Sequence, residues 1–261
     1  MRSSTRKLWC GGITLFFWAA SLVLAAVITL PVAAHAQAPS EFSNLQYFPK
    51  NISREELIGV MRGFSFSLGV RCQYCHDAKE GVAFKDTNFA SDEKPTKRTA
   101  RSMLRMVDTI NREYIARLES GTGNRVECVT CHHGLNKPTT MNAIMAEALE
   151  KKGVGAAITL YRDLRKKNFG GGQYDFGETP LNVLTESLLK QKKTQEAAAI
   201  MELNVEVNTP PSLWAYNLLA MAHKANSEID KAKADFRKIL ELNPSDQFAK
   251  KQLEELESAK P

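Results

Sequence analysis

The chain has 261 residues, of which 43% are hydrophobic and 25% charged, and its formal net charge is +6. This composition is typical of a folded globular protein and excludes an intrinsically disordered one. Three of the positive charges lie within the first seven residues, and no basic patch interleaved with aromatic residues follows them. We therefore expect no nucleic-acid partner, and the length is sufficient for more than one domain.

Residues 1–36 have the pattern of a secretory signal peptide. Three basic residues precede an apolar run from Gly11 to Leu30, and Ala34-His35-Ala36 supplies small residues for cleavage. The alternative is an uncleaved anchor, because the apolar run approaches the roughly 20 residues that span a bilayer. Both interpretations place the rest of the chain in the periplasm or on the outer face of the cytoplasmic membrane.

The first predicted helix begins after an extended segment over residues 37–50. Ser53 and Glu56 have the spacing of a capping box, which marks a helix start. Gly69 is expected to end the helix. The residues between them repeat at helical spacing and form one apolar stripe: Leu57, Met61, Phe64 and Leu68.

Two short stretches of the same type follow, Cys72-Gln73-Tyr74-Cys75-His76 and Cys128-Val129-Thr130-Cys131-His132. Each has the Cys-x-x-Cys-His pattern that attaches c-type haem. Two thiols at this spacing can form thioether bonds to both vinyl groups of one porphyrin, and the next residue then lies under the iron as an axial ligand. The sequence therefore predicts two covalently attached haem c groups.

Two other interpretations use the same cysteines. Four thiols can form an all-thiolate zinc site or two disulfides. Neither interpretation requires a histidine directly after both pairs. The pairs are also further apart than the halves of a compact zinc ribbon, which are separated by about 15–20 residues.

A polar segment over residues 77–95 predicts a loop, and a second helix is expected from Lys97 to Leu118. One face of this helix is apolar, with Met103, Met106, Ile110 and Tyr114. A helix with methionine, a turn and Cys-x-x-Cys-His thus occurs twice, which suggests a pseudo-symmetric pair of haems. From the stripes alone, these methionines can be sixth ligands of the iron or ordinary core residues.

A basic cluster lies at the start of the second helix, formed by Lys94, Lys97, Arg98 and Arg101. We expect a solvated basic face here, since surface ion pairs usually contribute under about 1 kcal/mol. The alternative is pairing with haem propionates or with an acidic partner.

The residues before each motif, Asn51 to Phe64 and Asp92 to Arg98, resemble the cytochrome subunit of photosynthetic reaction centres. The resemblance covers about residues 45–140. It implies His/Met ligation, with Met61 opposite His76 and Met106 opposite His132. Met103 competes with Met106 from one turn away.

Two features depart from that family. Its subunit carries four haems, whereas this chain has two motifs and would be a dihaem, half-length relative. The family tends to have Arg-Gly after the second motif, where this chain has His133-Gly134. We expect His133 at the surface or near a propionate, and the alternative is a distal ligand of the neighbouring haem.

From Met141 onward the composition shifts to Ala, Leu, Lys and Glu, and a repeat of 34 residues emerges. The pattern resembles the tetratricopeptide repeat, with an earlier degenerate unit from Met141 to Lys167 and a capping helix from Gln247 to Leu256. His223 is expected to be a packed core histidine. The positions that recur are Ala198, Glu202 and Pro210, which return as Ala232, Phe236 and Pro244.

The sequence thus predicts an all-α protein with a signal peptide at 1–36, a dihaem cytochrome c domain at 37–140 and a helical-repeat solenoid at 141–261. We expect an exported electron carrier, not an enzyme, with a redox partner such as a membrane complex and a protein partner bound by the repeats. The alternative is a dihaem peroxidase-like enzyme or a haem-based sensor, which would need one open iron coordination site. A scaffold whose repeats matter more than its redox chemistry is a third interpretation.

Overall fold

The computed structural model describes residues 42–78, 86–118 and 123–258. The chain forms two units, Met1–Ala38 and Pro39–Pro261. The first unit, and with it the predicted signal peptide, lies outside the described residues. No helix within the described residues is long and apolar enough to cross a membrane.

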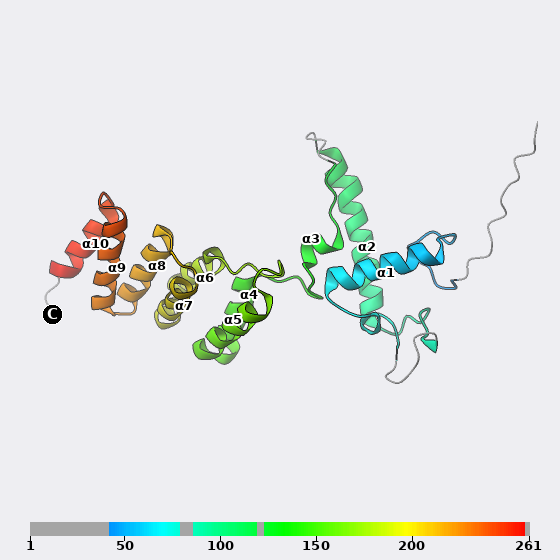
Figure 1. The fold of residues 1–261 in the computed structure, drawn as a ribbon, viewed down its shortest axis with the longest axis horizontal. Coiled ribbons are helices and arrows are strands. Elements are labelled where there is room, and N and C mark those ends of the chain that lie inside the picture. The colour runs from blue at the N-terminus through cyan, green and yellow to red at the C-terminus, as the bar shows by residue number, and fades with distance from the viewer. Residues whose placement is uncertain (1–41, 79–85, 119–122, 259–261) are drawn as a thin grey trace, which may run out of the picture. The chain divides into compact units, whose positions relative to one another are not determined.

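The described residues are helical, as predicted, and contain no strand beyond one isolated bridge between Asp77 and Asn88. Figure 1 shows the helices in chain order. Their bounds are α1 Arg54–Leu68, η1 Cys72–Tyr74, α2 Pro95–Thr109, η3 Ile110–Tyr114, η4 Ile115–Arg117, α3 Cys128–His132, α4 Met141–Lys152, α5 Val154–Asn168, α6 Glu178–Lys190, α7 Thr194–Val207, α8 Leu213–Ala225, α9 Ile229–Leu242 and α10 Gln247–Ser258.

Helix α1 has both predicted ends. The Ser53 hydroxyl accepts a hydrogen bond from the Glu56 N–H, and the Glu56 carboxylate accepts one from the Ser53 N–H, which completes the capping box. At the other end Gly69 adopts the left-handed conformation with φ of 62°. Leu57 is the one buried side chain of this helix.

The second predicted helix begins and ends at other residues than Lys97 and Leu118. Helix α2 begins at Pro95, because proline is well suited to the first helical position, where its missing N–H needs no partner. The α-helix ends at Thr109, and a π-helical turn (η3) and a 3-10 turn (η4) follow. Asn111, within the π-helical turn, is buried.

Helices α4 to α10 form the predicted helical repeats. Consecutive helices pack as pairs, with α6 against α7, α8 against α9, and α10 against the last pair. Three of the six positions that recur across 34 residues lie in the core, Ala198, Ala232 and Phe236, whereas Glu202, Pro210 and Pro244 are exposed. Side chains from α4 to α8 form the largest apolar cluster: Met141, Met145, Ala148, Ala157, Tyr161, Phe176, Leu181, Leu184, Leu188, Ala197, Ala198, Ile200, Leu203 and Ala222.

The earlier unit and the capping helix are also present. The pair α4 and α5 falls within the expected Met141–Lys167 range, apart from one residue at its end, and α10 begins at Gln247. His223 is buried, as predicted, and its two ring nitrogens lie 2.6 Å from Asp235 Oδ2 and 3.3 Å from Glu202 Oε1.

The apolar side chains are distributed unequally between the two parts of the chain. Among the described residues before Met141, Leu57 is the only buried apolar side chain. Large apolar side chains in the same part are instead exposed: Tyr47, Ile58, Phe66, Tyr74, Phe89, Met103, Met106, Tyr114, Leu118 and Val129. This part of the chain therefore leaves most of its large apolar side chains accessible, whereas the helical repeats bury theirs.

Candidate haem-binding site

The two Cys-x-x-Cys-His motifs each form a short helical turn. Residues Cys72–Tyr74 form η1 and Cys128–His132 form α3. A helical turn places side chains three positions apart on one face, so each turn presents its two thiols together.

All four cysteines of the two motifs are free thiols, which does not support the disulfide interpretation. Burial raises the pKa of Cys75 and of Cys128. In the described part of the chain, no three His, Cys, Asp or Glu side chains gather as they would around a metal ion. The geometry therefore does not support the all-thiolate zinc site either.

His132 is held in the orientation that an iron ligand needs. Its Nδ1 lies 2.7 Å from the Leu135 carbonyl oxygen. A hydrogen bond from Nδ1–H to this carbonyl fixes the tautomer and leaves the Nε2 lone pair for a metal.

His76 is placed by the segment around Phe89. Its Nδ1 is buried without a hydrogen-bond partner, and Phe89 contacts the imidazole, with the ring centroids 5.0 Å apart. Burial lowers the pKa of His76, and the positive charges of Lys97, Arg101 and Lys94 lower it further.

The first motif is bound to the start of α2. The Thr96 hydroxyl donates a hydrogen bond to the Tyr74 carbonyl over 2.5 Å. The Lys94 ammonium donates another to the Gln73 carbonyl. The helix that leads into the second motif therefore holds the first motif.

The second motif is bound in turn to the end of α1. The Gly134 N–H donates to the Ser67 carbonyl over 2.9 Å. The approach is so close that a Cβ on Gly69 would lie 2.1 Å from the Gly134 carbonyl oxygen. Only glycine fits here, for this reason and because of its positive φ.

Asn111 fixes the segment that enters the second motif. Its side chain accepts a hydrogen bond from the Val126 N–H and donates one to the Val126 carbonyl, both over 2.8 Å. An amide that pairs with both main-chain groups of one residue replaces a strand partner. Asn111 was missed by the sequence reasoning, although asparagine inside a helix, where it is a poor helix former, is itself a signal of a local hydrogen-bonding role.

The basic cluster at the start of α2 corrects one prediction. The expected solvated basic face is wrong for Lys97, which is 9% exposed. Its ammonium donates hydrogen bonds to the carbonyls of Phe89, Ala90 and Ser91 over 2.8, 3.1 and 2.7 Å. The long side chain reaches back over the preceding loop, a contact that spacing along a helix does not reveal.

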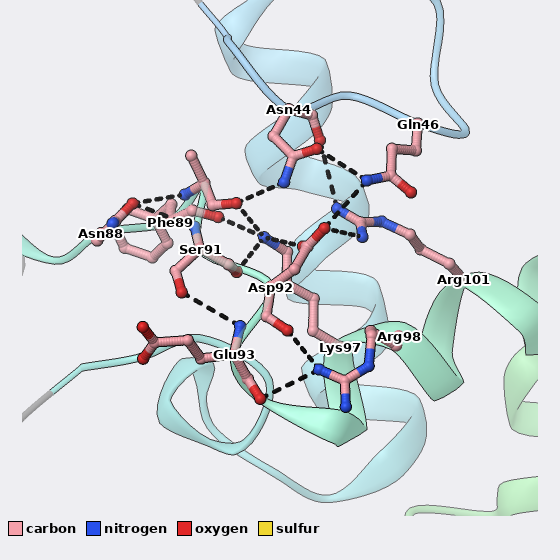
Figure 2. A network of polar contacts seen from close by, with 11 residues as sticks. Asn44, Gln46, Asn88, Phe89, Ser91, Asp92, Glu93, Lys97, Arg98 and Arg101 are labelled. Carbon is pink, nitrogen blue, oxygen red and sulfur yellow. Dashed lines mark hydrogen bonds and ion pairs between the residues drawn. The ribbon is translucent and has the colours of Figure 1, made fainter.

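Figure 2 shows how Asp92 joins this network. Its carboxylate pairs with Lys97 at 3.2 Å and with Arg101 at 2.8 Å. These contacts, together with Asn44, hold the pKa of Asp92 far below its usual range, and the Arg101 hydrogen bond is the largest cause. Arg98 donates to the carbonyls of Asp92 and Glu93.

The candidate sixth ligands lie on the helices that precede the motifs. Met61 is half-buried on α1, whereas Met103 and Met106 on α2 are 43% and 47% exposed. His133 is exposed and caps α3 in the left-handed conformation, with φ of 50°. This exposure agrees with the expectation that His133 lies at the surface.

The donor set fits haem c. Each motif supplies two free thiols and one histidine: Nδ1 of His132 is held at the Leu135 carbonyl, and Nδ1 of His76 is buried without a partner. Exposed apolar side chains lie on α1 and α2, the helices that precede the motifs. These are the groups that covalent haem attachment requires.

Comparison with known proteins identifies the family. A family model described as the photosynthetic reaction centre cytochrome C subunit matches residues 79–226. The chain belongs to this family. The match begins after the first motif and continues into the helical repeats, beyond the 45–140 range expected from the sequence. Covalently bound haem c is therefore implied for this chain as for other reaction centre cytochromes.

Curated relatives match shorter stretches of this chain. Cytochrome c-554 of Chloroflexus aurantiacus is 38% identical over 112 residues, which cover 40% of this chain and 25% of the relative. The reaction center cytochrome c subunits of Thermochromatium tepidum and Rubrivivax gelatinosus are 35% and 31% identical, over 34% and 32% of this chain and 24% of each relative. The chain thus spans about a quarter of the length of these relatives.

Among solved structures, the second tetratricopeptide domain of human RPAP3, in complex with an HSP70 peptide, is similar to this chain at a TM-score of 0.33 and 16% identity. The match covers 46% of this chain and 94% of that domain. The assignment of helical repeats rests on the stacked helix pairs themselves.

Proposed function

We propose that this reaction-centre-type cytochrome is an exported electron-transfer protein with two covalently attached haems, and that it is not an enzyme. Cys72, Cys75 and His76 would hold the first haem, and Cys128, Cys131 and His132 the second. Met61 and Met106 would complete the coordination of the two irons. Haem iron supplies one-electron redox chemistry when bound.

One observation carries this proposal: each motif is held by the helix that leads into the other. Ser67, at the end of α1, accepts the hydrogen bond from Gly134 after the second motif. Thr96, at the start of α2, binds Tyr74 within the first motif. Such mutual bracing keeps the two motifs in one small unit, which favours transfer of single electrons between neighbouring centres.

The protein residues have separate tasks in this function. The Leu135 carbonyl orients His132, and Phe89 packs against the His76 ring. Apolar side chains of α1 and α2 exclude water from the centres, which sets the local dielectric and hence the potentials. Thioether sulfur as sixth ligand gives a higher potential than a second imidazole does.

The experiment uses the full chain, produced in cells that attach c-type haem. Intact mass gives the number of haems, and the band of oxidised His/Met haem at about 700 nm gives the ligation. We expect two haems and two equivalents of this band. Met61→Leu and Met106→Leu should each remove one equivalent, whereas the control Met103→Leu should remove none.

Other outcomes would contradict the proposal. A chain without covalent haem would refute it entirely. One equivalent of the band, with a second haem that binds added carbon monoxide, would favour the enzyme or sensor with an open coordination site. A band that is lost in Met103→Leu and kept in Met106→Leu would reassign the second sixth ligand.

The proposal also includes export and docking. The basic and apolar pattern of residues 1–36 supports export to the periplasm or the outer membrane face, and the N-terminal sequence of the mature protein tests it. The helix pairs α6 to α9 support docking of a protein partner. Deletion of residues 141–261 should then reduce electron delivery in cells while haem is retained, and unchanged delivery would contradict docking.

A further inference from the structure

The loop before α2 is built around one buried positive charge. The Lys97 ammonium lies among three main-chain carbonyls, those of Phe89, Ala90 and Ser91, and near the Asp92 carboxylate. Three N–H groups facing these acceptors satisfy the full donor capacity of an ammonium. Burial lowers the pKa of Lys97, and the pairing with Asp92 opposes that effect.

This loop contacts the histidine of the first motif. The Phe89 ring meets the His76 ring edge-on, with centroids 5.0 Å apart, and the Phe89 backbone hydrogen-bonds the imidazole. The Phe89 carbonyl also accepts from Lys97 over 2.8 Å. Lys97 thus holds the residue that orients His76, without contacting His76 itself.

The electrostatic surroundings of the two motifs differ in sign. At the first motif the Lys94 ammonium donates to the Gln73 carbonyl, and the Lys97 ammonium binds the carbonyl of Phe89, whose ring meets His76. Both cations act on Cys75. At the second motif the residue at the start of α3 is Glu127, whose carboxylate acts on Cys128. A nearby positive charge stabilises an added electron, and it does so more strongly in a buried site than in water.

We propose that Lys97 is a positioning residue that fixes the Phe89 loop against His76 and raises the reduction potential of the first haem site above that of the second. This inference rests on the proposed attachment of haem at both motifs. Electrons entering the pair would then settle at the first site. The charge asymmetry gives the pair a direction, from the second motif to the first.

The test is a spectroscopic redox titration of the full chain with both haems attached. The variant Cys128→Ala/Cys131→Ala, which should carry only the first haem, assigns the two components. Lys97→Met retains the length of the stem and removes the charge. We expect this variant to change the ferrous-to-ferric ratio of the first component at least threefold. That change lowers its potential by about 28 mV, at 59 mV per tenfold change. The potential of the second component should stay unchanged.

Two further variants separate charge from structure. Arg105→Met is the matched control, because Arg105 is an exposed cation on the same helix that is not among the groups acting on His76. It should leave both potentials unchanged. Asp92→Asn removes a negative charge while Lys97 keeps its three carbonyls, so the first potential should rise. If the two substitutions acted only by loosening the loop, Lys97→Met and Asp92→Asn would shift the potential of the first haem in the same direction.

The outcomes decide between the inference and the proposed function. Three results would overturn the inference. The first is an equal shift of potential in Lys97→Met and Arg105→Met, and the second is a fall of the first potential in Asp92→Asn. The third is a second site that titrates at a higher potential than the first. If Lys97→Met fails to retain the first haem, the sign of the Asp92→Asn shift decides. Absence of haem from the first motif of the unaltered chain would instead refute the proposed function.

Discussion

The contact between Gly69 and Gly134 gives the sharpest prediction about stability. In Gly69→Ala the new methyl group would lie 2.1 Å from the Gly134 carbonyl oxygen, so the second motif must move away from α1. Left-handed backbone costs alanine about 1–2 kcal/mol. Loss of the Gly134 to Ser67 hydrogen bond adds about 0.5–1.5 kcal/mol. The haem-binding part should therefore lose about 1.5–3.5 kcal/mol of unfolding free energy.

The assay is thermal unfolding of the full chain, followed by haem absorbance. About 1 kcal/mol corresponds to roughly 4–8 °C in a domain of this size, so the midpoint should fall by roughly 6 to 28 °C. Trp214, on α8, is the one tryptophan after the predicted signal peptide, so fluorescence of the mature chain reports the repeats, and its midpoint should not move.

Gly59→Ala is the matched control on the same helix. A Cβ at Gly59 meets nothing within 4 Å. Alanine inside a helix should stabilise it by about 0.5–1 kcal/mol. If the haem absorbance midpoint of Gly69→Ala equals that of Gly59→Ala, the two motifs do not brace each other and the reasoning is refuted.

Three further predictions concern other contacts. Asn111→Ala should destabilise the haem-binding part by about 2–4 kcal/mol, because it leaves both main-chain groups of Val126 unpaired. Denaturant unfolding followed by haem absorbance measures this, and a midpoint equal to that of the unaltered chain would count against it. Phe236 is fully buried, so Phe236→Ala should lower the unfolding free energy of the repeats by about 3–5 kcal/mol. Trp214 fluorescence in denaturant measures this loss. A loss smaller than that of the control Phe248→Ala, at an exposed position, would contradict the prediction. The carboxylates of Asp235, Glu202 and Glu228 outweigh burial and raise the pKa of His223. The resulting stability is fully present below the unfolded pKa, about 6.5, and is lost as the pH rises through the folded pKa. The repeat midpoint should therefore fall with rising pH in the unaltered chain but not in His223→Gln, and parallel pH profiles would refute the role of His223.

Local patterns predicted the local structure well. The capping box at Ser53, the left-handed glycine at Gly69 and the 34-residue recurrence each depend on residues close in sequence or on a strict period. The two Cys-x-x-Cys-His motifs likewise carry their chemistry within five residues. Haem attachment and iron ligation at these residues stay predictions.

Long-range contacts were beyond the reach of the sequence. The burial of Lys97 depends on a loop that folds back over its side chain, and charge spacing alone favoured solvent exposure. The π-helical turn at Ile110–Tyr114 accompanies the bond from Asn111 to Val126, a partner on another segment. The bracing of the motifs was invisible for the same reason, because Ser67 and Gly134 share no pattern.

The crossed arrangement of helices and motifs has a consequence for biosynthesis. The chain is made from its N-terminus, so α1 and the first motif exist before α2 and Gly134 have been synthesised. The first motif can take its place once the start of α2 is made, because Thr96 and Lys94 bind its main chain. The end of α1 is completed later, because Gly134, which pairs with Ser67, follows the second motif. The two halves of the bracing therefore form in sequence during synthesis, the first motif before the second.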